Sequence, residues 1–241
     1  MGAASGYPQC FLNIDKNAEK KRIIRKGVKK VKDAIKLFKP DIFFPAGGSY
    51  TISGKFSILN KYVAQPNQND FKKYFKDKRY NIVNLEGSEI DIANKELRKA
   101  TKKIQNYSHK KLPISVRESK YFYDKIKYDK SLNKLDDLFD IAKYKYYNIV
   151  NSKKINANWR IEFCTYDNLN LNENGNINLN KSFFKKSYIL SKDSLIKKQE
   201  PDLICHLDKR LFYCLLKRVS PWNTALTGSI IIFSRKSKKY N

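Results

Sequence analysis

Apolar residues recur at intervals of three and four between residues 15 and 39, and this spacing predicts an amphipathic helix. Asp15 is a suitable N-cap, and Pro40 ends the helix. Most lysine and arginine side chains of the segment fall on the opposite side, so we interpret them first as a solvated face. The apolar stripe comprises Ile24, Val28, Val31, Ile35 and Phe38.

The next ten residues, DIFFPAGGSY (41–50), predict a strand that is buried on both sides and ends in a glycine turn. A helix followed by such a strand is typical of an α/β fold. Gly47-Gly48-Ser49 could offer backbone N–H groups and a hydroxyl to a phosphate, with Lys55 and Lys61 close behind. Because the stretch matches neither a Walker loop nor Gly-x-Gly-x-x-Gly, a plain turn is the favoured interpretation.

The middle of the chain predicts basic helices after a short strand and a polar turn within residues 81–92. The helices are expected from Ile92 to Lys111 and from about Arg117 to Tyr147, with Pro113 between them. Asp91, with Glu86 and Glu89 nearby, could belong to a metal site. With no histidine close by, Asp91 is expected to cap the first helix instead.

From residue 156 onward, the pattern changes to short alternating strands. Strands are expected within 158–167, 187–191, 201–207 and 229–236, and a hairpin-like turn within 168–180. Residues 207–218 predict a short amphipathic helix, and 219–228 predict a loop. This last third is therefore expected to form an α+β layer.

The chain of 241 residues carries 50 Lys and Arg against 23 Asp and Glu, a formal charge of +27. Such an excess suggests nucleic-acid binding. It also fits the lysine-rich amino-acid composition that AT-rich coding DNA produces. Three observations favour this second interpretation: lysine outnumbers arginine, the basic residues are spread along the chain, and no nucleic-acid-binding motif is present. Nucleic acid is thus a partner to consider but not the favoured one. Without a membrane-span or signal-peptide pattern, a cytoplasmic protein is expected.

No self-sufficient catalytic or metal site is evident, so the catalytic residues are unknown and no metal ligand is assigned. The four cysteines form no Cys-x-x-Cys pair and are expected to be buried free thiols. His109 and His206 lie far apart, and neither stands in a context that suggests pairing with a serine or cysteine. A Gly-x-Ser-x-Gly nucleophile motif is absent.

Three segments in order carry a family resemblance: SGYPQCF (5–11), FFPAGGSYTISGKFSILNKY (43–62) and LDKRLFYCLL…SPWNTALTGSIIIFSRK (207–236). Together they resemble the latter part of metallo-β-lactamase-fold proteins related to CMP-N-acetylneuraminate hydroxylase. The middle of the chain, about 95–155, contributes little to it. The matching positions are Pro45, Ala46, Gly47, Leu59, Asn60, Lys61, Tyr62, Trp222, Asn223, Ala225, Gly228, Ser229, Phe233 and Arg235.

The resemblance implies part of an αββα sandwich, so the expected fold class is α/β, becoming α+β at the C-terminus. Residues 1–92 would be the second-half portion of that fold, 93–150 a basic helical insert and 151–241 the C-terminal α+β layer. The family's His-x-His-x-Asp-His motif is absent from this sequence. Zinc or iron is therefore implied only if an N-terminal half supplies the ligands. The expected partner is that upstream half or, alternatively, a second copy of this chain.

The function implied by the resemblance is that of a metal-dependent hydrolase or hydroxylase component, inactive as this chain alone. Its contribution would be to bind an anionic or sugar-nucleotide-type substrate. For Trp222, a core anchor is as well supported as a ligand contact. The alternatives are a basic nucleic-acid-binding protein and a catalytically inactive interaction module. The substrate-binding residues implied are Ser49, Tyr50, Lys55, Asn60, Lys61, Trp222 and Asn223.

Overall fold

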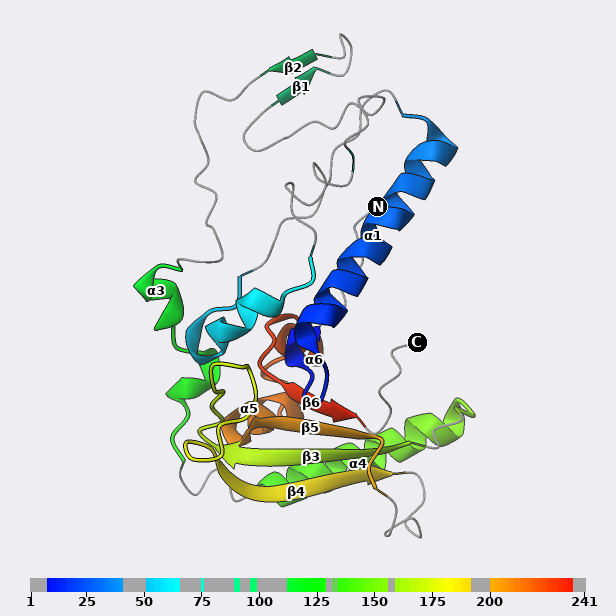
Figure 1. Cartoon of the computed structure of the whole chain (residues 1–241). Helices are drawn as coiled ribbons and strands as arrows, with labels where there is room; N and C mark the ends of the chain where they lie inside the picture. Colours follow the sequence, from blue (N-terminus) through cyan, green and yellow to red (C-terminus); the bar gives the residue numbers. More distant parts are fainter. Residues whose placement is uncertain are drawn as a thin grey trace. The chain divides into compact units, whose positions relative to one another are not determined.

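The computed structural model describes residues 8–40, 51–65, 75, 89–91, 96–98, 112–128, 132, 134–155, 159–191 and 200–235. It is an α/β structure with helices and a four-stranded mixed sheet (Figure 1). The chain divides into two compact units, each of which draws on separated stretches of the sequence. Unit 1 comprises 1–8, 15–51 and 61–112, and unit 2 comprises 9–14, 52–60 and 113–241.

Unit 1 contains the long helix α1, Lys16–Phe38, which confirms the helix predicted from periodicity. Asp15 caps it by accepting hydrogen bonds from the backbone N–H groups of Asn17 and Ala18, both at 3.0 Å. The apolar stripe is buried against Phe75, apart from Phe38, whose side chain is 65% exposed. The prediction was wrong for Phe38 because the helix ends there, and Lys39 takes a left-handed conformation. The buried members are Ile24, Val28, Val31 and Ile35.

Unit 1 also contains a two-stranded antiparallel ribbon of β1 (Glu89–Asp91) and β2 (Glu96–Arg98). The helix predicted to start at Ile92 with Asp91 as its cap is therefore wrong over 96–98. Pairing of the two short strands satisfies the backbone groups that a helix would have bonded internally. The rest of the predicted helix, 92–95 and 99–111, lies outside the described residues.

Unit 2 is built on a sheet of order β4-β3-β5-β6. The central strands β3 (Arg160–Asp167) and β5 (Leu203–Asp208) are parallel, and β4 (Phe183–Ser191) and β6 (Ile232–Arg235) flank them in antiparallel pairs. All four strands were predicted, β3 from alternation, and β4 is longer than expected. The predicted turn in 168–180 is closed by an isolated antiparallel bridge between Leu171 and Ile177. At the chain start, Phe11 bridges Phe233 beside the short 3₁₀ turn η1, Pro8–Cys10.

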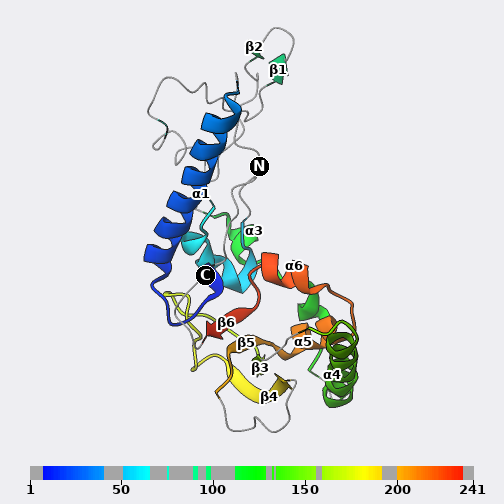
Figure 2. The ribbon, with the colours of Figure 1, turned by 90° about the vertical axis from the view of Figure 1, so that its right-hand side faces the viewer.

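Helices α4 (Leu135–Ser152) and α5 (Lys209–Leu216) lie on one face of this sheet (Figure 2). An aromatic core fills the contact, since the rings of Phe139, Phe163, Tyr188 and Phe212 lie 5.1 to 6.2 Å apart between centroids. In the part of the chain that the structure describes, no helix is long and apolar enough to cross a membrane.

One helix prediction and one loop prediction in unit 2 were wrong in part. The helix expected over 117–147 is confirmed over 135–147 as part of α4, but its first part is replaced by the end of α3 (Ile114–Arg117) and the 3₁₀ turn η3 (Phe122–Lys125). The chain breaks at η3 because Tyr123 is drawn into the core, where it is fully buried. The loop expected over 219–228 contains α6, Trp222–Thr227, whose Ala225 is buried.

The 3₁₀ stretch η2, Gly54–Tyr62, begins at a residue with a φ of 62°, in the left-handed region that favours glycine. A Cβ atom on Gly54 would lie 2.6 Å from the carbonyl oxygen of Ser119. We therefore expect Gly54→Ala to lower the free energy of unfolding by about 2 kcal/mol, from the backbone strain and the clash. Urea unfolding of the two proteins measures this difference. A variant as stable as the wild type would show that the backbone at 54 can relax.

Candidate functional site

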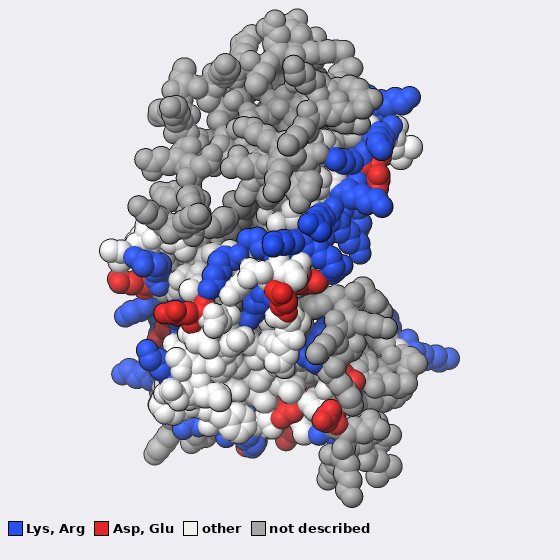
Figure 3. All heavy atoms as spheres, in the orientation of Figure 1, with Lys and Arg blue, Asp and Glu red and all other residues white. Residues whose placement is uncertain are grey.

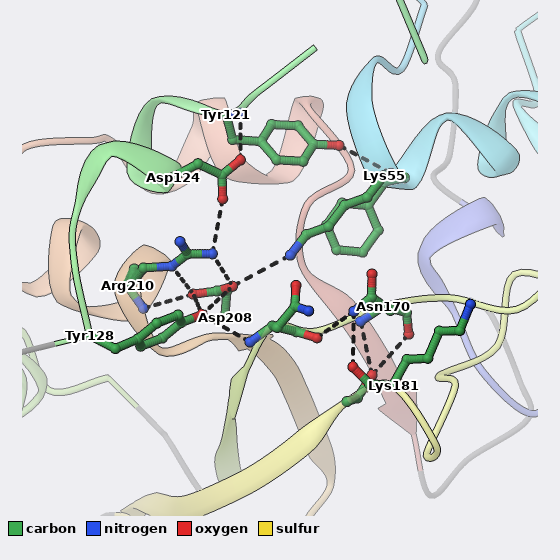
Figure 4. A network of polar contacts seen from close by, with 11 residues as sticks. Lys55, Tyr121, Asp124, Tyr128, Asn170, Lys181, Asp208 and Arg210 are labelled. Carbon is green, nitrogen blue, oxygen red and sulfur yellow. Dashed lines mark hydrogen bonds and ion pairs between the residues drawn. The ribbon is translucent and has the colours of Figure 1, made fainter. Parts of the chain in front are cut away.

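A buried ion pair forms where β5 passes into α5 in unit 2 (Figure 4). Asp208 is only 1% exposed and caps α5 by accepting a hydrogen bond from the Arg210 backbone N–H at 3.0 Å. The Arg210 guanidinium donates to both carboxylate oxygens, with Nε 3.0 Å from Oδ1 and Nη2 2.9 Å from Oδ2. This two-pronged geometry is the strong form of the pair, and it holds both charges in place.

The segment 121–128 closes over this pair. Asp124 accepts a second hydrogen bond from Arg210 Nη2 at 2.9 Å. The Tyr128 hydroxyl lies 3.1 Å from both Asp208 oxygens and accepts from the Asn168 backbone N–H at 2.9 Å. The Arg210 guanidinium also stacks on the Tyr128 ring, 4.4 Å from its centroid. Burial acts to lower the pKa of Arg210, but the hydrogen bonds and the charge of Asp208, together with Tyr128 and Asp124, outweigh it and raise the pKa.

Lys55 completes the network from η2. Its Nζ lies 3.5 Å from Asp208 Oδ2 and over the rings of Phe56 and Tyr123, at 5.7 and 5.9 Å from their centroids. Burial lowers the pKa of Lys55, although Asp208 and Asp124 oppose the shift. The positive charges of Lys55 and Arg210 balance the negative charges of Asp124 and Asp208. The Lys55 side chain is still 21% exposed, so the network reaches solvent at this residue.

Two further tyrosines connect η2 to η3. The Tyr121 hydroxyl donates to the Ser53 carbonyl and accepts from the Phe56 backbone N–H at 3.2 Å. The Tyr123 hydroxyl is buried without a hydrogen-bond partner among the described residues. Burial, reinforced by Asp208, raises the pKa of Tyr123, so this hydroxyl stays neutral. A buried, unsatisfied hydroxyl costs free energy, and a ligand oxygen or a water would relieve that cost.

A second row of polar groups crosses the sheet of unit 2. His206 Nδ1 lies 3.0 Å from the Tyr166 hydroxyl, and His206 Nε2 lies 3.0 Å from Ser234 Oγ. The local sequence gave no sign of this pairing, because β6 brings Ser234 beside His206 from a distant part of the chain. Burial lowers the pKa of His206 to about 4. Such an imidazole is a weak base near neutral pH, which argues for a structural role.

The predicted binding residues near the glycine loop lie in different environments. Ser49 and Tyr50, with the rest of DIFFPAGGSY, lie outside the described residues. Asn60 is buried, and its amide group bonds to the backbone of Ile52 and Ser57 at 2.7 to 2.8 Å, so it holds η2 together. The Lys61 ammonium lies 5.0 Å from the centroid of the Tyr62 ring, and its carbonyl accepts a hydrogen bond from Lys20.

Trp222 and Asn223 begin α6 and are both exposed. The Trp222 ring lies 5.7 Å from the Phe163 ring, so one side of it packs on the aromatic core while 38% of the side chain remains exposed. The Asn223 carbonyl accepts a hydrogen bond from Thr227 within the helix. Both the anchoring and the ligand-binding interpretations of Trp222 are compatible with this position.

Among the described residues, no three His, Cys, Asp or Glu side chains converge to hold a metal ion. The family resemblance implies zinc or iron only where an upstream half supplies the ligands, so this finding does not bear on that expectation. The four cysteines are buried free thiols, as predicted. Burial raises the pKa of Cys164 and of Cys205 to about 12, so neither is a reactive thiolate.

Sequence reasoning missed the centre of the network, Asp208 and Arg210. The local signal was an aspartate between a strand and a helix, a typical N-cap position. The run YFYD (121–124) is a second signal, because it places three aromatic rings next to a carboxylate that can pair with a buried cation. Neither signal shows that the two segments meet. Comparison with known proteins adds no relative to these observations: no family model, no curated protein and no solved structure matches the chain.

Proposed function

We propose that unit 2 binds an anionic small molecule at the Lys55 ammonium. The observation that carries this proposal is the unused bonding capacity at that point. Lys55 has three N–H donors, and its one hydrogen bond to the described residues, to Asp208, is long at 3.5 Å. The unsatisfied hydroxyl of Tyr123 belongs to the ring beneath the same ammonium. Oxygen atoms of a phosphate or carboxylate could accept from the Lys55 ammonium, whereas the Tyr123 hydroxyl is fully buried.

The surrounding charges set the strength of such a site. Asp208 and Asp124 are held by Arg210, so the ammonium of Lys55 is not the sole counter-ion of either acid. An anion at Lys55 would thus compete with one long contact rather than with a two-pronged ion pair. Because burial lowers the pKa of Lys55, binding should fall off at a lower pH than an ordinary lysine would allow.

Within this proposal, the chain is the substrate-binding, C-terminal part of a metallo-β-lactamase-like hydrolase or hydroxylase. The sequence resemblance supports this family, and the α/β architecture of unit 2 is compatible with it. The sandwich itself, the sugar-nucleotide-type substrate and the metal-bearing upstream half remain parts of the proposal. Co-expression with a protein carrying His-x-His-x-Asp-His tests the assembly, with a stable complex expected. Absence of any complex would favour an independent binding or interaction module.

The binding site is tested by replacing Lys55 with methionine. Calorimetric titration with CMP-N-acetylneuraminate, and with inorganic phosphate as the simpler probe, should show saturable binding to the wild type. Lys55→Met should weaken it by at least tenfold, since a hydrogen bond to a charged group contributes about 1.5–3 kcal/mol. Lys186→Met is the matched control, because Lys186 is also paired with one acid, Asp136, but on the exposed surface.

The two variants separate a specific site from general attraction by a basic protein. Both remove one positive charge from unit 2. We expect Lys186→Met to bind as the wild type does. Equal losses in the two variants, or no saturable binding of either probe to the wild type, would contradict a site at Lys55.

A further inference from the structure

The basic residues of the described chain are concentrated on α1 rather than spread evenly. The helix contains ten Lys or Arg residues and only two acids, Glu19 and Asp33. By contrast, α4 contains two lysines and three aspartates. Figure 3 shows the Lys and Arg side chains of α1 as a long band. The large positive charge of the chain therefore has a structural focus in unit 1, which the even spacing of lysines along the sequence conceals.

The exposed cations of α1 form rows along the helix axis. Residues four apart lie on the same face, about 6 Å apart along the axis. One row contains Lys21, Arg25 and Lys29, and the next contains Arg22, Lys26 and Lys30; all six are exposed. The 23 residues extend over about 34 Å, close to the length of ten base pairs of duplex. Arg22 alone of these six is paired within the helix, with Glu19.

This arrangement is unfavourable for the isolated helix. Like charges four residues apart destabilise a helix by about 0.2–0.5 kcal/mol per pair. Four pairs carry this penalty: Lys21–Arg25, Arg25–Lys29, Arg22–Lys26 and Lys26–Lys30. Burial of the apolar stripe on the other face keeps the helix in place. A polyanion lying along the rows would remove the repulsion and would release its own counter-ions.

We propose that this face, defined by the two rows of α1, binds the phosphate backbone of double-stranded nucleic acid. Its stiffness and regular spacing suit a duplex, which carries one negative charge per about 1.7 Å of axis. Single-strand binding instead relies on aromatic stacking platforms, and no exposed position from Asn17 to Lys36 is aromatic. Lysine-rich contacts of this kind read the backbone and not the bases, so binding is independent of sequence.

A membrane surface is the competing polyanion, and the packing of α1 disfavours it. A helix that lies in a bilayer surface inserts its apolar side between the lipids. In α1 that side is occupied, because Val28 and Val31 are buried in the core with Phe75. The surface belongs to unit 1, so this proposal stands independently of the Lys55 site of unit 2.

The test measures binding of labelled 16-base-pair DNA and RNA duplexes by fluorescence anisotropy at several salt concentrations. For about five phosphate contacts, the slope of log K against log salt should be about −4.5. Lys21→Gln/Arg25→Gln/Lys29→Gln should weaken binding at least tenfold and reduce the slope by about 3. The two duplex arms decide whether DNA, RNA or both are bound.

The matched control is Lys134→Gln/Lys145→Gln/Lys217→Gln, which removes the same charge from exposed positions of unit 2. It should leave the slope within about one of the wild type. Melting curves should show both variants folded, and the α1 variant at least as stable as the wild type. Equal losses in the two variants would overturn the proposal, as would tighter binding to phosphatidylserine vesicles than to either duplex.

Discussion

Replacing Arg210 with methionine is expected to lower the free energy of unfolding of unit 2 by about 3–5 kcal/mol. The substitution keeps the length of the side chain but leaves the Asp208 carboxylate, 1% exposed, without its two-pronged partner. Among the described residues, Lys55 is then the cation nearest to Asp208, and at 3.5 Å it compensates poorly. Urea unfolding followed by near-UV circular dichroism, which reports the packing of the aromatic core, measures the loss.

A second substitution separates the lost charge partner from lost packing. Asp208→Asn removes the charge while its side-chain oxygen can still cap α5 at the Arg210 backbone N–H. The double variant Asp208→Asn/Arg210→Met should therefore be more stable than Arg210→Met alone, because no uncompensated charge remains buried. A double variant less stable than Arg210→Met would show that packing of the arginine, and not its charge, is what stabilises the site.

The parts of the fold that were predictable from the sequence are those in which local pattern and final environment agree. The Asp15 cap and the stripe of α1 follow from spacing alone, and β3 forms over the segment whose residue pattern predicted a strand. The failures are short elements such as η3 and α6, where one or two buried side chains decide the backbone. A prediction based on periodicity needs more turns than these elements have.

The candidate site was only partly predictable, because its groups are far apart in sequence. Lys55 and Asp208 are 153 residues apart, and Arg210 and Asp124 are 86 apart. A motif can suggest that Lys55 and Asn60 are polar residues beside a loop, but it cannot tell which one is exposed to a ligand. The structure makes that distinction: the amide of Asn60 bonds to the backbone of its own turn, whereas the ammonium of Lys55 lies at the edge of the network.

The row Tyr166–His206–Ser234 is likewise built from residues far apart in the sequence. It gives the second large expected effect, a loss of stability in mild acid. His206 is 9% exposed and neutral in the folded state, with a pKa of about 4, whereas an exposed histidine has a pKa of about 6.5. Between these values the unfolded chain binds more protons than the folded one, so stability must fall as the pH falls. Linkage gives a loss of about 2 kcal/mol at pH 5, increasing to about 3 kcal/mol at pH 4.

The variant His206→Gln isolates this contribution, since an amide can bond to both hydroxyls without titrating in this range. Both proteins would be unfolded with urea at pH 7.5 and at pH 5, where most carboxylates are still ionised. The wild type should lose about 2 kcal/mol more than the variant between the two pH values, whatever the cost of the substitution itself at pH 7.5. Parallel pH dependence in the two proteins would mean that His206 is protonated in the folded state, and therefore that water or an acid reaches the row. The comparison thus measures how dry the middle of this sheet is. A dry site keeps His206 a weak base beside the Ser234 hydroxyl, whereas a solvated site leaves its basicity close to that of an exposed histidine.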